Sequence, residues 1–204
     1  MKHTKILLVL ISICIFAACT SESETNVNQD TKNELKKIEE VQPTIDFKFL
    51  TKNTEKELNE LLNSEGYNGL YDSKLIIGTF ENDELIITSK KIQDILSLYF
   101  KLIAQEANYN ADHSSFEFIS AKENNGYPML ISRGVCKIKG ESVSVGIGIK
   151  ESQDREAHFD NGLSTITCTG CDVVCSPRRT ESGDGWCTNC KSYGNCTKTE
   201  TIGG

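Results

Sequence analysis

The sequence lacks an excess of positive charge, and it lacks an apolar run long enough to cross a bilayer. Its 204 residues carry 22 basic and 29 acidic side chains, which gives a formal net charge of −7. An acidic chain is repelled by nucleic acid and by anionic lipid headgroups, so we expect neither as a direct partner. The apolar run at residues 6–18 has 13 residues, whereas a membrane-spanning helix needs about 20.

The sequence also lacks the motifs of several common ligand sites. It contains no glycine-rich phosphate-binding loop of the usual form. Asp184 stands between two glycines, but the Asp-x-Asp spacing of a calcium loop is absent. No internal repeat is present. Because none of these patterns indicates a reaction, we expect no enzymatic activity.

The N-terminal residues have the pattern of an export signal. Lys2 and Lys5 precede the apolar run, which ends in Phe16-Ala17-Ala18-Cys19. A basic start, a short apolar stretch and small residues before the cleavage point are typical of signal peptides. The last four residues resemble the lipobox of bacterial lipoproteins, with phenylalanine in the place where leucine is usual. The resemblance implies that Cys19 becomes the lipidated N-terminus, and that acyl chains hold the protein in the cell envelope, at the outer membrane.

Composition divides the rest of the chain into segments. Residues 20–44 are polar and charged, and we expect a tether that ends near Pro43. The full predicted division is a signal and lipobox at 1–19, the tether at 20–44, a folded domain at 45–152, a linker at 153–164 and a cysteine-rich module at 165–204.

Residues 45–152 read as an α+β domain. Residues 45–50 alternate as a half-buried strand does, and Thr54 has the spacing of a capping box that opens a short helix. Residues 75–80 and 84–88 flank Asn82-Asp83 as a hairpin would, and Ser89 precedes a strongly amphipathic helix. Three strands are expected at residues 116–121, 129–139 and 142–149. The predicted fold is therefore a small, mainly antiparallel sheet with two helices, followed by a separate cysteine-rich knuckle.

The C-terminal segment needs covalent or coordinate cross-links. Six cysteines fall between residues 168 and 196, and few apolar groups lie among them. So small an apolar set cannot offset the entropy of ordering the segment. The cysteines are Cys168, Cys171, Cys175, Cys187, Cys190 and Cys196.

Two chemistries fit these six cysteines. Cys168 and Cys171 are separated by fifteen residues from Cys187 and Cys190, which is the spacing of a four-cysteine zinc site and resembles a zinc ribbon. In that case one structural zinc is bound, and Cys175 and Cys196 are left over. The alternative is three disulfides and no cofactor, which an oxidising compartment favours. The sequence does not choose among the possible connectivities.

A third interpretation assigns redox chemistry to the tail. Trp186-Cys187-Thr188-Asn189-Cys190 resembles the active site of thioredoxin-like oxidoreductases, which implies Cys187 as nucleophile and Cys190 as resolving thiol. The expected flanking strand and helix are missing, because a Ser-Gly-Asp-Gly turn precedes the motif. The sequence thus favours an exported, lipid-anchored protein with a binding or structural role. The alternative is an extracytoplasmic thiol–disulfide or metal-handling protein. Neither hypothesis identifies the protein or small molecule that would be bound.

Overall fold

A computed structural model describes residues 45–136, 140–172, 175–190 and 194–201. The predicted signal segment, Cys19 and the tether lie outside these residues. The helices are α1 (Phe47–Ser64), α2 (Lys90–Glu106) and the short 3-10 helix η1 (Ala121–Glu123). The strands are β1 (Gly78–Glu81), β2 (Glu84–Ile86), β3 (Ala111–Ile119), β4 (Met129–Cys136), β5 (Ser142–Glu151), β6 (Glu156–Phe159), β7 (Thr165–Cys171), β8 (Pro177–Arg179), β9 (Gly185–Cys187) and β10 (Gly194–Thr201).

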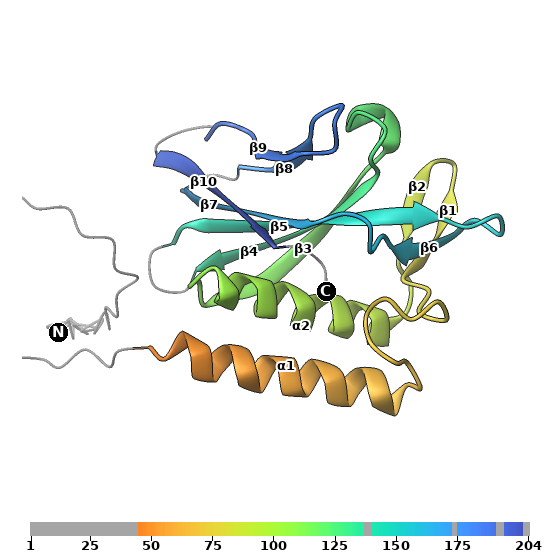
Figure 1. Cartoon of the computed structure of the whole chain (residues 1–204), viewed down its shortest axis with the longest axis horizontal. Helices are drawn as coiled ribbons and strands as arrows, with labels where there is room; N and C mark the ends of the chain where they lie inside the picture. The colour runs from red at the N-terminus through yellow and green to blue at the C-terminus, as the bar shows by residue number, and fades with distance from the viewer. Residues whose placement is uncertain (1–44, 137–139, 173–174, 191–193, 202–204) are drawn as a thin grey trace, which may run out of the picture.

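The elements form four layers. α1 packs on α2, and α2 packs on the sheet through β3, β4 and β5. The β8–β9 hairpin covers the opposite face of the sheet (Figure 1). None of the described helices is long and apolar enough to cross a membrane.

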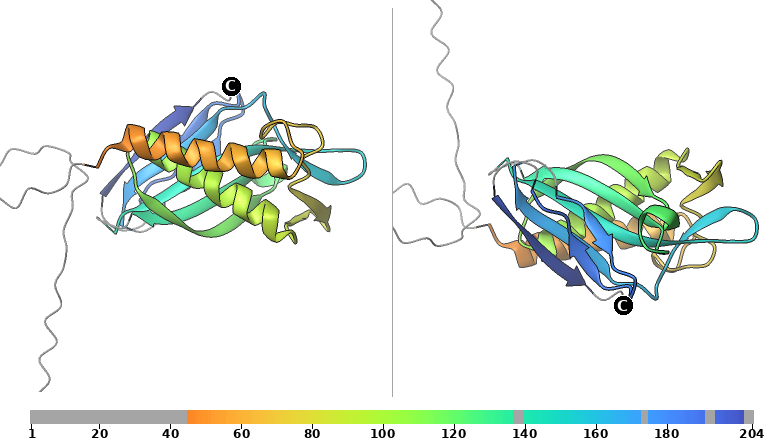
Figure 2. Two further views of the ribbon diagram at one scale, coloured as in Figure 1. Left: turned by 90° about the horizontal axis from the view of Figure 1, so that it is seen from below. Right: turned by 90° about the horizontal axis from the view of Figure 1, so that it is seen from above.

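The sheet is antiparallel and curled, and β5 is its central strand. Among the described residues it contains eight strands. One edge of β5 pairs with β4, which in turn pairs with β3. The other edge is shared, since β7 pairs with the first half of β5 and β6 with the second half. Two arms therefore leave this edge, one through β7 to β10 and one through β6 to β1 and β2 (Figure 2).

The predicted strand at residues 45–50 is wrong, because these residues begin α1. Asp46 caps the helix, and its Oδ1 accepts a hydrogen bond from the Phe49 amide at 3.0 Å. Thr54, which was expected to cap a helix, lies inside α1 and is buried. Alternation over so few residues is compatible with a strand or with a helix. Here the Asp46 cap and the packing of Leu58 and Leu62 in the core stabilise the helix.

The hairpin and the amphipathic helix are confirmed. Asn82 and Asp83 both have positive φ, as the two central residues of a tight type I′ turn require. Ser89 caps α2, and its Oγ accepts a hydrogen bond from the Ile92 amide at 3.4 Å. α2 is the most buried element of the helical layer, and Phe100 has no exposed surface.

Each face of the sheet has its own core. The face toward α2 carries alternating side chains of β5 such as Val145 and Ile147, together with Leu130 of β4. The opposite face carries Ile131 and Ile166, which pack with the cysteines under the hairpin. Because successive side chains of a strand point to opposite faces of the sheet, the same strands contribute residues to both cores.

The predicted fold class is wrong in two respects. The sheet is large rather than small, and no separate cysteine-rich knuckle exists in the described part of the chain. β7 and β10 from the cysteine-rich segment are strands of the main sheet. The segment has few apolar groups of its own, but it packs on Ile119, Met129 and Ile131 of the preceding strands. Its core is shared, and this is why it does not form an independent unit.

The stretch expected to be a polar linker also contributes to the sheet. β6 pairs with β1 and β5 and buries Ala157 and Phe159. The small residues Ser144, Gly146 and Gly148 of β5 are buried. A Cβ added at Gly146 would lie 2.7 Å from Cγ of Pro177 in β8. Gly146 therefore permits the hairpin to lie close against the sheet.

Candidate functional site

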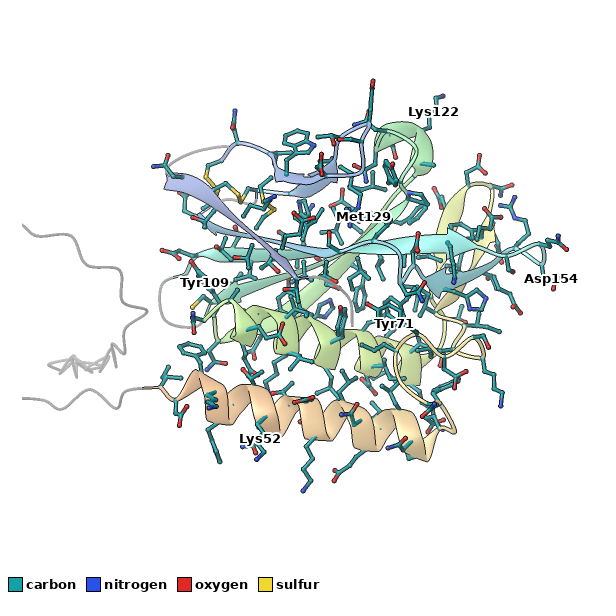
Figure 3. All side chains as sticks on the ribbon, in the orientation of Figure 1. Lys52, Tyr71, Tyr109, Lys122, Met129 and Asp154 are labelled. Atoms are coloured by element: carbon teal, nitrogen blue, oxygen red, sulfur yellow. A yellow bond between two sulfur atoms is a disulfide. The ribbon has the colours of Figure 1, made fainter. Side chains whose placement is uncertain are left out.

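The six C-terminal cysteines form three disulfides, so the disulfide alternative is confirmed. Their Cα atoms are 5.8, 5.6 and 6.3 Å apart within the pairs, in the usual range. The pairs are Cys168–Cys187, Cys171–Cys190 and Cys175–Cys196. They tie the hairpin and β10 to β7 and to the segment that follows it. Figure 3 shows the sulfur atoms gathered between the hairpin layer and the sheet.

The four residues predicted to bind zinc are brought together, but as two disulfides. The two Cys-x-x-Cys pairs lie side by side, and each cysteine of one pair bonds to a cysteine of the other. Their sulfur atoms are thereby used, and no metal is needed to hold the segment. The spacing that indicates a zinc ribbon also suits two parallel cross-links.

The predicted redox pair is divided between two disulfides. Cys187 bonds to Cys168, and Cys190 bonds to Cys171. Trp186, which precedes the pair, is 43% exposed on the outer side of β9. It lies directly across the hairpin from Arg178.

Exposure differs between the two cysteines of each disulfide. Cys168, Cys171 and Cys175 have no exposed surface. Their partners on the hairpin side and on β10 are half-buried. Each cross-link therefore joins an inner cysteine that is fully buried to an outer cysteine that is partly exposed.

The sulfur atoms form one continuous cluster. Those of Cys168, Cys187 and Cys196 all lie within 4.8 Å of one another, and so do those of Cys171, Cys175 and Cys196. Cys196 belongs to both groups. The sequence gives no sign of this contact, because it depends on how β10 crosses beside β7.

A buried arginine, which sequence reasoning missed, fastens the hairpin to the sheet. Arg179 is 1% exposed. Its Nη1 donates to the Gly183 carbonyl at 2.6 Å, and its Nη2 donates to the Ser164 carbonyl. Burial lowers the pKa of this guanidinium, and the acidic Glu200 and Asp160 oppose that shift. One side chain thus joins the hairpin loop to the start of β7.

The turn after β3 adds hydrogen bonds that hold β8 in place. The side-chain oxygen of Asn124 accepts from the Arg179 amide at 2.9 Å, and Asn124 Nδ2 donates to the Tyr127 carbonyl at 2.6 Å. Asn125 Nδ2 donates to the Arg179 carbonyl at 2.6 Å. By sequence these asparagines are turn residues, but here they also satisfy the backbone of β8.

Replacing Arg179 is expected to destabilise the protein much more than replacing its neighbour. Arg179→Ala removes donors from two carbonyls and leaves a cavity under the hairpin, at a cost of about 3 kcal/mol in the free energy of unfolding. Arg178→Ala is the matched control, because Arg178 is only partly buried and donates to its own neighbour, Pro177. We expect it to cost less than about 1 kcal/mol. Urea denaturation measures both, and equal losses would contradict the structural role of Arg179.

A polar depression of about 580 Å³ lies beside Arg179. The carboxylates that line this depression accept hydrogen bonds from neighbouring side chains. Glu200 accepts from the Ser164 hydroxyl and from Lys198, and the Ser164 bond is the largest cause that lowers its pKa. Asp184 accepts from Ser182 at 2.6 Å. These groups stabilise the loop, and they do not converge on a reacting position.

A serine–histidine contact at the other face of the sheet is not an activated nucleophile. Ser97 Oγ lies 3.3 Å from His113 Nδ1, but the hydroxyl donates to the Gln93 carbonyl at 2.7 Å. Its proton is therefore directed away from the imidazole. Burial lowers the pKa of His113, which packs between Phe100 and Phe116.

No family model, curated protein or solved structure matches the chain. The cysteine cluster is the feature that bears most directly on function. Three disulfides indicate an oxidising, extracytoplasmic environment, because cytosolic reductants keep such thiols reduced.

Proposed function

We propose that this protein is exported and held in the cell envelope by lipid on Cys19, where its folded part has a binding or structural role. The observation that carries the proposal is the disulfide bonding of all six C-terminal cysteines. It supports export, and the Phe16-Ala17-Ala18-Cys19 pattern supports lipidation after export. The polar residues 20–44 then space the folded part from the membrane.

A non-enzymatic role is supported by what the reactive side chains do. In the described residues the six C-terminal cysteines cross-link the layers, and Arg179 fastens the hairpin. The acidic groups around Arg179 accept hydrogen bonds from neighbouring hydroxyl and ammonium groups. The β8–β9 hairpin packs on a large sheet and is cross-linked to it. Its outer face therefore has a fixed shape, on which the half-exposed Trp186 lies opposite Arg178. Tryptophan and arginine are enriched among residues that dominate binding energy, so this face suits a protein or small-molecule partner.

Replacing Cys19 is expected to release the protein from the membrane. The signal residues alone do not anchor a cleaved chain, and acyl chains on Cys19 would supply the attachment. In a bacterial host we expect wild type to sediment with the membranes, mainly the outer membrane, and to incorporate labelled fatty acid. Cys19→Ala should lose the label and move to the soluble fraction or stay unprocessed. Cys14→Ala, in the apolar part of the signal, is the matched control and should behave as wild type.

Two results would overturn the proposal. One is a wild-type chain without labelled acyl groups. The other is a Cys19→Ala variant that is processed and still sediments with the membranes as wild type does. Fractionation of inner from outer membrane on the same samples separates the anchoring from its location.

A further inference from the structure

The arrangement of the six sulfur atoms permits more than cross-linking. Thiol–disulfide exchange needs a thiolate close to a disulfide sulfur, and it proceeds through a mixed disulfide. Cys196 lies within 4.8 Å of both Cys168 and Cys187, and within the same distance of Cys171 and Cys175. The Cys175–Cys196 disulfide therefore stands between the other two and can exchange with either.

Only the outer cysteines of the three disulfides have surface that a thiol from solvent can reach. Cys187 is half-buried, whereas its partner Cys168 has no exposed surface. Attack on this disulfide from outside therefore occurs at Cys187 and expels Cys168 as a thiolate. That thiolate is formed in a closed apolar site, and burial disfavours its charge.

We propose that the cluster is a thiol-capture site, in which a small thiol attacks Cys187 and the displaced thiolate passes through the disulfides to Cys190. In the first step the incoming thiolate bonds to Cys187 Sγ, and the Cys168–Cys187 bond breaks. In the second step the Cys168 thiolate bonds to Cys196 Sγ and expels Cys175. Each step forms one S–S bond and breaks one, so no oxidant or reductant is consumed.

The third step brings the thiolate to the outer side of the module. The Cys175 thiolate lies within 4.8 Å of Cys171. It bonds to Cys171 Sγ and breaks the Cys171–Cys190 bond. The incoming thiol stays on the protein as a mixed disulfide, the number of S–S bonds is unchanged, and the released thiolate is on Cys190.

Two physical effects favour the complete path. The negative charge moves from the buried Cys168 to the half-buried Cys190, where water can solvate it. Cys168 is at the same time held in a new disulfide with Cys196, so its thiolate is no longer present beside Cys187 to expel the captured thiol. Cys187 and Cys190 are thus the two ends of a path through six sulfur atoms, and they never bond to each other.

The test identifies which cysteine carries glutathione and which cysteine carries the thiol that is released. The full-length protein is treated with glutathione in mildly alkaline solution and quenched with acid, which stops thiol–disulfide exchange. Its thiols are then labelled with N-ethylmaleimide in denaturant, so that buried thiols react as exposed ones do, and the labelled positions are mapped by mass spectrometry. We expect molecules that carry glutathione on Cys187 and maleimide on Cys190. Glutathione on Cys187 together with maleimide on Cys168 would overturn the path, and so would a complete absence of glutathione on Cys187. The thiol of Cys136 lies outside the three disulfides and is labelled in every molecule under these conditions, so it is the internal control for complete labelling.

Two double variants interrupt the path at different points. Cys175→Ser with Cys196→Ser removes the central disulfide, and the maleimide should then appear on Cys168. Cys171→Ser with Cys190→Ser is the matched control, because the path can still run as far as Cys175 and the label should move there. The same label position in both variants would overturn the proposal. A circular dichroism spectrum confirms that each variant is folded, and if either is not, the wild-type map alone decides.

Discussion

Removing the Cys168–Cys187 disulfide is expected to lower the free energy of unfolding by about 3 kcal/mol. The two cysteines are 19 residues apart, and a loop of that length has this value in the chain-entropy description of cross-links. Apart from this disulfide, the hairpin is held by the hydrogen bonds of Arg179 and by the neighbouring disulfide rather than by apolar burial of its own. It contributes few apolar side chains to the core beneath it, which the sheet and the cysteines largely supply.

The measurement is thermal and urea unfolding of Cys168→Ala with Cys187→Ala, in which we expect the midpoint temperature to fall by about 10 °C. Cys136→Ala is the matched control, since it removes a buried sulfur outside the three disulfides. It should cost about 1 kcal/mol. If the double variant were no less stable than this control, the disulfide would not contribute to holding the hairpin on the sheet.

Placing a methyl group at Gly134 is expected to be comparably damaging. A Cβ at this position would lie 2.3 Å from the Asp112 carbonyl oxygen and 2.5 Å from Cζ of Phe100. The carbonyl belongs to β3, which pairs with β4 at this point, and Phe100 is fully buried in α2. Neither group can move without opening the sheet or displacing the helix. We therefore expect Gly134→Ala to cost about 3 kcal/mol, at the upper end for an overpacked core.

Gly162→Ala is the matched control for this variant. Its added Cβ would meet only the Asp160 carboxylate oxygen at 3.3 Å, and that side chain can adjust. We expect a change within about 0.5 kcal/mol. Urea denaturation of both variants gives the comparison, and a Gly134→Ala protein as stable as Gly162→Ala would show that α2 does not pack this closely on the sheet.

Local patterns in the sequence predicted most of the first two-thirds of the described chain. The 3.6-residue period marked α2, and Ser89 marked its start. Asn82-Asp83 predicted a turn that needs positive φ, and the alternation of apolar and small or polar residues predicted β4 and β5. In these stretches the signal lies within the element itself.

Predictions failed where a segment depends on distant partners. Residues 45–50 alternate over too few positions to distinguish a strand from a helix, and the Asp46 cap with packing on α2 decided. β6 is short and flanked by polar residues, so only its place between β1 and β5 makes it a strand. Arg179 gave no signal, because a charged residue next to Arg178 reads as solvated surface.

The sequence by itself determined that the C-terminal segment must be cross-linked, since its few apolar groups cannot offset the entropy of ordering it. It also supplied six cysteines, an even number that can close completely. Only the tertiary structure decided which of them meet and what they hold together. β7 had to pair with β5, and β10 with β7, before the cysteines of β7 could face those of the hairpin. The physical reason is distance, because bonding between sulfur atoms depends on their separation in space, and residues 19 to 21 apart acquire a fixed separation only when the sheet assembles.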